Sequence, residues 1–166
     1  MSIEIERKYI ILMPSINAMM SLDGYSSSEI LQIYLNGESG VTHRIRSRKS
    51  GADTVYTETK KVRIDKMSSH EDEHEISGKD FERLSMNIKD GTSPIRKKRY
   101  TFRFEGQLFE IDVYPEWKKT CILETELETR EKTVRFPDFI EIIEEVTGNH
   151  AYSNAAMASS FPKESR

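Results

Sequence analysis

An early stretch of the chain, Glu4-Ile-Glu6-Arg-Lys8, combines two carboxylates with an ammonium group. In an extended strand, alternate residues point to opposite faces, so the three charged side chains share one face and the isoleucines lie on the other. Two carboxylates suit a hard divalent cation, and the neighbouring lysine suits a phosphate group that the cation also binds. A solvated face of an ordinary antiparallel strand shows the same alternation. The motif alone therefore leaves both interpretations open.

The alternation recurs on later segments, and charges of one sign gather within each of them. Solvated strand faces usually mix polar residues, with little reason for one sign to repeat. A sheet closed with these faces inward would have a charged interior, and isolated buried charges cost on the order of several kcal/mol each. Such an interior would need water, cations and a polyanion. The recurring positions are Arg44, Arg46 and Arg48; Glu71, Glu73 and Glu75; Lys97 and Arg99; Glu110 and Asp112; and Glu124, Glu126 and Glu128.

The elements that position these residues are mostly short strands separated by turn signals. Ser50-Gly51-Ala52-Asp53 and Glu105-Gly106 predict hairpin turns. A capping residue, Ser77, and an early proline, Pro137, each predict the start of a helix. Strands are predicted at 2–12, 29–35, 41–49, 54–63, 70–76, 94–104, 107–114 and 120–130, and helices at 15–20, 78–87, 137–146 and 153–158. Eight strands and few helices favour an α+β, mainly β, antiparallel fold, either a sandwich or a closed barrel.

Length and composition narrow the class of protein. The chain has 166 residues, a formal net charge of -3 and one cysteine, Cys121. We expect one domain over 1–158, followed by a disordered polar tail at 159–166. The net charge argues against a general nucleic-acid binder, and a single cysteine excludes a disulfide framework. Since the N-terminus reads as a strand and no apolar run has membrane length, we expect a cytoplasmic protein without a membrane partner.

The ordered set of motifs resembles the CYTH, or triphosphate tunnel metalloenzyme, family over about residues 2–158. The opening Glu4-x-Glu6-x-Lys8 matches the signature of that family. The other matches follow in the family's order: Gln32-Ile-Tyr34-Leu, Arg44-Ile-Arg46, Thr57-Glu-Thr59-Lys60, Glu73-His-Glu75-Ile, Ile95-Arg-Lys97-Lys-Arg99-Tyr, Glu110-Ile-Asp112-Val, Glu124-Thr-Glu126-Leu, Glu145-Val-Thr-Gly and Tyr152-Ser-Asn154. The resemblance implies an eight-stranded closed antiparallel β-barrel with a few flanking helices. Its tunnel would bind a linear triphosphate, with Mg²⁺ or Mn²⁺ assisting hydrolysis of a phosphoanhydride.

The resemblance also implies roles for the matched residues. Glu73 and Glu75 are candidates for a second metal or for orienting the attacking water, and Asp112 would align a base or a ligand water. The implied metal ligands are Glu4, Glu6, Glu124 and Glu126. The implied phosphate-binding bases are Lys8, Arg44, Arg46, Lys60, Lys97 and Arg99. The implied catalytic set is Glu4, Glu6, Lys8, Lys60, Glu73, Glu75 and Asp112.

Other charged residues near these motifs are expected on the surface. Arg48 and Lys61 lie near turns or out of step with the alternation of inward-facing residues. A glutamate at a position such as Glu71 is more often a surface charge than a ligand. We therefore expect all three residues to face solvent. Tyr152 and Asn154 either cover one mouth of the tunnel or anchor the terminal helix.

The leading functional hypothesis is a triphosphatase acting on inorganic triphosphate, since the sequence has no evident motif for binding a nucleobase. Nucleoside triphosphates and thiamine triphosphate are further substrates within the family. Two alternatives remain open: a class IV-type adenylate cyclase and a non-catalytic polyphosphate- or nucleotide-binding module. Pairing of two copies through an apolar outer face of the sheet, giving a homodimer, is also left open.

Overall fold

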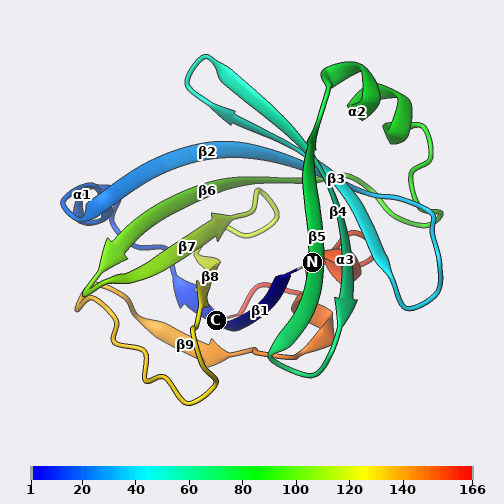
Figure 1. Cartoon of the computed structure of the whole chain (residues 1–166). Coiled ribbons are helices and arrows are strands. Elements are labelled where there is room, and N and C mark those ends of the chain that lie inside the picture. Colours follow the sequence, from blue (N-terminus) through cyan, green and yellow to red (C-terminus); the bar gives the residue numbers. More distant parts are fainter. Residues whose placement is uncertain (1, 166) are drawn as a thin grey trace.

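A closed antiparallel barrel dominates the computed structural model, which describes residues 2–165 (Figure 1). Within these residues the strand order is β5-β4-β3-β2-β6-β7-β8-β1-β9, and β5 also pairs with β1. Eight strands therefore form the ring, as predicted, and β9 lies outside it. The strands are β1 Ser2–Leu12, β2 Asp23–Tyr34, β3 Thr42–Ser50, β4 Asp53–Arg63, β5 Ser68–Ile76, β6 Ile95–Phe104, β7 Gln107–Val113, β8 Thr120–Glu126 and β9 Ile142–Glu145.

Strand β1 closes the ring and has three partners. Along one edge it pairs with β8, from Glu6 to Leu12. Along the other edge it pairs first with β5, only over Ser2–Ile5, and then with β9 over Tyr9–Ile11. Strand β9 thus satisfies backbone groups of β1 that the short β5 contact leaves open.

The predicted helix at 137–146 is wrong. Residues 142–145 form β9, and after it the backbone N–H of Val146 donates to the carbonyl of Lys8 at 2.8 Å. Pro137 and the spacing of apolar residues favoured a helix, but the open edge of β1 offers hydrogen bonds to an extended chain. A tertiary pairing therefore overrides the local preference.

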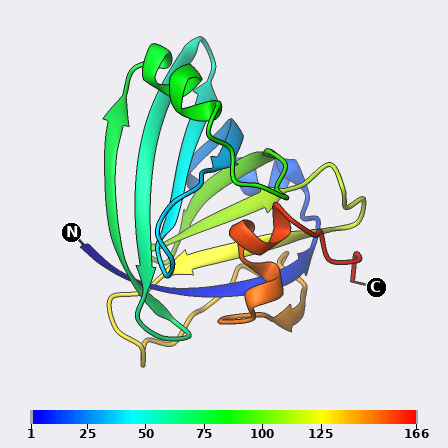
Figure 2. The ribbon, with the colours of Figure 1, turned by 90° about the vertical axis from the view of Figure 1, so that its right-hand side faces the viewer.

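The remaining predicted helices are present. Helix α1 (Ile16–Met20) begins after Ser15, helix α2 (Gly78–Ser85) after Ser77, and helix α3 (Asn154–Met157) after Ser153. In each case the serine hydroxyl accepts a backbone N–H three residues ahead, which satisfies one free donor of the first turn. Figure 2 shows α2 at the rim of the β3–β4–β5 wall, while α3 and the preceding 3₁₀ turn η1 (His150–Tyr152) lie at the other side of the barrel.

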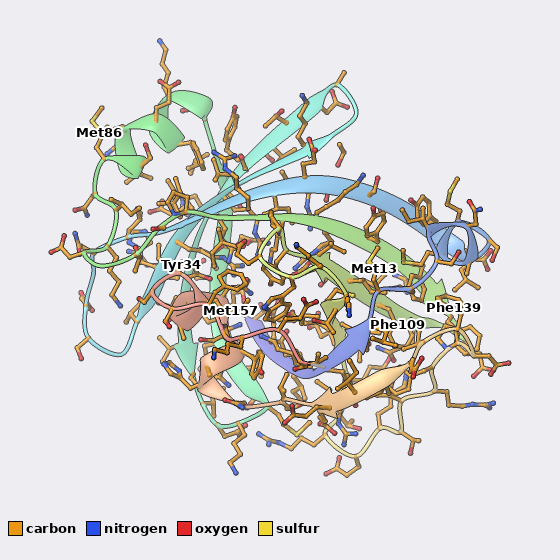
Figure 3. The ribbon with its side chains drawn as sticks, turned by 180° about the vertical axis from the view of Figure 1, so that it is seen from behind. Met13, Tyr34, Met86, Phe109, Phe139 and Met157 are labelled. Atoms are coloured by element: carbon orange, nitrogen blue, oxygen red, sulfur yellow. The ribbon has the colours of Figure 1, made fainter. Side chains whose placement is uncertain are left out.

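Apolar clusters cover the outer faces of the barrel and cap one of its ends. On one outer face Phe109 and Phe139 belong to one apolar cluster, and on another Phe81 of α2 packs against Tyr56. Inside the barrel, Ile10 and Tyr34 belong to a buried cluster that includes residues of α3. Figure 3 shows Tyr34 near Met157 and, separately, Phe109 near Phe139. We call the end covered by η1 and α3 the capped end.

The segment 159–165 contacts the barrel, whereas the sequence suggested a disordered tail at 159–166. The indole N–H of Trp117 donates to the carbonyl of Pro162 at 2.9 Å. The carboxylate of Glu164 accepts the backbone N–H groups of Lys118 at 3.0 Å and Thr120 at 2.7 Å. A single acidic side chain thereby satisfies donors of the turn between β7 and β8. Arg166 lies outside the described residues.

Among the described residues no helix has the length and apolar character needed to cross a membrane.

Candidate active site

Charged side chains line a cavity of about 820 Å³ inside the barrel. The cavity runs from the loop at 37–41, at the capped end, to Arg48 and Leu108 beside the β3–β4 and β6–β7 turns. Its cationic lining is Lys8, Arg44, Arg46, Arg48, Lys61, Arg63, Lys89, Lys97 and Arg99. Its acidic lining is Glu4, Glu6, Glu38, Glu71, Glu73, Glu110, Glu124 and Glu126. The recurring charged faces of the sequence thus point inward.

Carboxylates face one another on the wall formed by β5, β1 and β8. Burial of the carboxyl group raises the pKa of Glu4 to about 8, and a hydrogen bond and charge repulsion from Glu71 act in the same direction. The charge of Glu124, together with burial, raises the pKa of Glu6 to about 7. Burial opposes ionisation of Glu124 too, but the charges of Lys8, Arg99 and Lys97 together outweigh burial and lower the pKa of Glu124 to about 2. Close carboxyl neighbours therefore disfavour a second negative charge within each pair, which a cation between its members would offset.

This acidic wall fits a divalent cation. Its donors are carboxylate oxygens, which Mg²⁺ and Mn²⁺ prefer. The raised pKa values of Glu4 and Glu6 arise from burial together with close carboxyl neighbours, whose charge a cation would offset. Within residues 2–165, no three acidic, imidazole or thiol groups already form a complete metal-coordinating set. The pairwise arrangement suits a metal ion whose remaining ligands are phosphate oxygens and water.

A buried ion-pair network lies on the neighbouring wall. The carboxylate of Asp112 accepts from Nζ of Lys97 at 2.8 Å and from Nε and Nη2 of Arg99 at 2.7 and 2.9 Å. Although burial opposes ionisation of Asp112, the two cations hold its pKa far below the usual range. Nη1 of Arg99 also donates to Glu110 at 2.9 Å. Asp112 is absent from the cavity lining and lies behind Lys97 and Arg99, in contact with both.

Residues of η1 and α3 contact two of the buried lysines. Nζ of Lys8 donates to the carbonyl of Tyr152 at 3.1 Å and forms an ion pair with Glu124 at 3.4 Å. The amide oxygen of Asn154 accepts from Tyr114 Oη at 2.8 Å and lies 3.5 Å from Nζ of Lys97. Asn154 lines the capped end of the cavity, whereas Tyr152 does not line it and packs against the buried cluster that includes Tyr34. Both residues anchor the terminal segment, through the contacts with Lys8 and Tyr114.

Strand β3 carries three arginines with different surroundings. Arg44 lies 3.7 Å from Glu71 and 3.8 Å from Glu73. Arg46 instead donates from Nε and Nη2 to the amide oxygen of Gln32, at 3.0 and 2.8 Å. Burial, Arg44 and Arg99 lower the pKa of Arg46 to about 9. Within residues 2–165 neither Arg46 nor Arg48 has a carboxylate at ion-pair distance, so these two cations remain available to an anion.

The structure corrects the orientation expected for several charged residues. Lys60 is exposed and absent from the cavity lining, whereas Lys61 lines the cavity and lies 3.8 Å from Glu71. The reason is the register of β4 against β3 and β5, which places Thr59 and Lys61 on the inner face. Arg48 and Glu71, expected in solvent, also line the cavity. Glu75 is exposed near the end of β5 and does not line it.

The other residues of the predicted set meet in the cavity. Glu73 accepts from Oγ1 of Thr59 at 2.7 Å at the cavity wall. The other predicted site residues that line the cavity are Glu4, Glu6, Lys8, Arg44, Arg46, Lys97, Arg99, Glu124 and Glu126. Sequence reasoning gave no function to Tyr34, Lys89 or His150, which also line it. Lys89 lies in an irregular segment and His150 in the three-residue turn η1, and neither is long enough to show a periodicity that would indicate a direction.

Comparisons with solved structures agree with this arrangement. The inorganic triphosphatase NE1496 is similar over 98% of this chain and 98% of its own, with a TM-score of 0.60 and 28% sequence identity. The PH1819 protein from Pyrococcus horikoshii OT3 is similar over 77% of this chain and 80% of its own, with a TM-score of 0.55 and 22% identity, which shows the fold alone. No protein-family model and no curated protein sequence matches the chain. The barrel and its neighbours identify this chain as having the CYTH, or triphosphate tunnel, fold.

Proposed function

We propose that this protein is a metal-dependent triphosphatase that hydrolyses a phosphoanhydride bond of inorganic triphosphate inside its barrel. The observation that carries the proposal is the division of the cavity into facing walls, one of paired carboxylates and one of arginines and lysines. The similarity to NE1496, an inorganic triphosphatase, supports the same reaction. A linear polyanion with bound divalent cations matches this charge pattern along the length of the cavity.

The arginines of β3 and the bases of β6 would bind the phosphates. Arginine donates a planar pair of hydrogen bonds to phosphate, whereas lysine acts as a point charge. Because Asp112 already aligns Lys97 and Arg99, these cations need little reorganisation when negative charge spreads over the transferred phosphoryl group. Lys61 takes the place that the sequence gave to Lys60.

The acidic wall would hold the metal. Glu4, Glu6 and Glu126 would be its ligands, with Glu71 and Glu124 beside them. Bound Mg²⁺ or Mn²⁺ would neutralise phosphate charge and polarise the scissile phosphoryl group. Glu73, held by Thr59 and open to the cavity, is the carboxylate that we assign to orienting the attacking water.

A substrate panel tests this proposal. The protein is incubated with triphosphate, ATP and thiamine triphosphate under Mg²⁺ or Mn²⁺, and orthophosphate and cyclic AMP are measured. We expect orthophosphate from triphosphate, lost in E6Q and in metal-free buffer. Cyclic AMP from ATP would instead identify a cyclase, and triphosphate binding without turnover would identify a binding module. Hydrolysis that is unchanged in E6Q would contradict the metal site.

We also propose a cytoplasmic location. The single cysteine, Cys121, is free and buried, and burial raises the pKa of its thiol to about 12, which suits a reducing compartment without requiring one.

A further inference from the structure

Gln32 is an uncharged, buried side chain of the barrel wall that contacts the charged lining of the cavity without lining it. It lies on β2 next to Arg46 of β3 in the strand register and is 0% exposed. Its amide oxygen accepts two hydrogen bonds from Arg46, and its amide nitrogen donates to Oη of Tyr34 at 2.6 Å. Because a guanidinium only donates, the amide oxygen must face Arg46 and the amide nitrogen must face the tyrosine. The orientation of all three side chains is therefore coupled.

Arg46 differs from four other cations that line the cavity in the partner of its charge. A carboxylate lies within ion-pair distance of Lys8, Arg44, Lys97 and Arg99. Two N–H groups of Arg46, one on Nε and one on Nη2, bind a neutral amide. A guanidinium has five N–H donors, so three remain for a ligand. Arg46 is thus fixed in place without having its charge neutralised.

We propose that Gln32 is a positioning residue that fixes Arg46 for the substrate phosphates while leaving its positive charge uncompensated. This inference rests on the proposed function. Gln32 also orders Tyr34: the phenol oxygen accepts from the amide, so the phenol hydrogen is free to donate toward the cavity that Tyr34 lines.

Replacing Gln32 with glutamate separates two roles that its side chain could have: holding Arg46 in place and leaving the charge of Arg46 unpaired. If Gln32 only held Arg46 in place, the isosteric glutamate would hold it better, because a carboxylate binds guanidinium through stronger charge-assisted bonds. If the neutrality of Gln32 matters, the same glutamate would pair with Arg46 and compete with phosphate. Q32E should therefore fold at least as stably as the wild type while it binds triphosphate more weakly.

The experiment measures triphosphate binding calorimetrically in metal-free buffer, together with the thermal midpoint of unfolding. We expect Q32E to raise the dissociation constant by about tenfold or more, on the scale of a hydrogen bond to a charged group, without lowering the midpoint. Q32M, which no longer holds Arg46, should weaken binding and lower the midpoint. The control is N17D, the same change from amide to carboxylate at an exposed residue of α1 that does not line the cavity, and it should leave triphosphate binding unchanged.

The outcomes separate this inference from the proposed enzyme activity. Equal triphosphate binding by Q32E and wild type overturns the role of Gln32, and so does an equal loss in N17D. Triphosphate binding by the wild type with no orthophosphate released after Mg²⁺ or Mn²⁺ is added overturns the triphosphatase assignment alone, since the comparison of Q32E with wild type still decides the role of Gln32. A wild type that binds no triphosphate, either without metal or with Mg²⁺ or Mn²⁺, overturns both.

Discussion

Arg99 and Asp112 form a two-point ion pair across β6 and β7, with Nε donating to Oδ1 at 2.7 Å and Nη2 to Oδ2 at 2.9 Å. The side chains are 7% and 1% exposed, so water contributes little to either charge. The pair therefore serves two purposes: it allows a cation to be buried, and it holds that cation at the cavity wall.

We expect D112N to lower the free energy of unfolding by about 3–5 kcal/mol, because it leaves Arg99 and Lys97 buried without their shared carboxylate. Urea unfolding of the wild type and D112N measures the difference. The pKa of Asp112 is lowered in the folded state, so its stabilisation is present above the unfolded pKa and is lost as the pH falls through the folded pKa. The difference should shrink below about pH 4, where the unfolded carboxyl becomes protonated. It should also shrink as the pH rises toward about 7, because burial lowers the pKa of Lys97 to about 7 and loss of Asp112 would lower it further. A difference that grows below about pH 4 would contradict the assignment.

Lys60 and Lys61 form a matched pair for testing the inner face of β4. K61Q should raise the KM for triphosphate by about tenfold, because it removes a cation from the cavity next to Glu71. K60Q makes the same change of charge on an exposed residue and should leave KM unchanged. Steady-state kinetics with both variants check the register, and a larger effect in K60Q would show that the opposite face of the strand binds phosphate.

Arg48 extends the basic lining toward the β3–β4 turn. We expect R48Q to lower kcat/KM for triphosphate by about tenfold and to reduce its dependence on salt, because one cation facing the substrate is removed. K49Q is the control, since Lys49 is the exposed neighbour on the other face of β3. Identical salt dependence in the two variants would mean that Arg48 contributes only to overall charge.

Gly148 allows close contact between the turn after β9 and the β4–β5 turn. It has φ of +74°, and an added Cβ would lie 2.8 Å from Cβ of Lys66 and 3.1 Å from its carbonyl oxygen. G148A should therefore cost more than the roughly 1–2 kcal/mol of left-handed backbone strain alone. Gly51 has φ of +60° with nothing within 4 Å, so G51A measures the strain by itself. Thermal unfolding of both variants separates the two contributions, and equal losses would show that Lys66 moves aside freely.

Alternation within a strand could be predicted from the sequence, whereas pairing between distant strands could not. Glu4, Glu6 and Lys8 fall on one inner face because period-2 alternation is local. The choice between Lys60 and Lys61 depends on the register of β4 against β3 and β5, which both neighbours determine. Strand β9 was missed because its partner is β1, at the other end of the chain.

The long sequence separation between β1 and two of its partner strands has a consequence for folding. This strand carries Glu4, Glu6 and Lys8. Its pairing with β5 covers only Ser2–Ile5, whereas its other pairings are with residues 120–126 and 142–145, which are synthesised much later. Loop-closure entropy makes such long-range pairing a late event, so most of β1 and its charged face stay exposed until then. A nascent chain would then have no partly assembled cavity: the carboxylates and bases meet only when the barrel closes. We therefore expect catalytic competence and complete folding to be acquired in the same step.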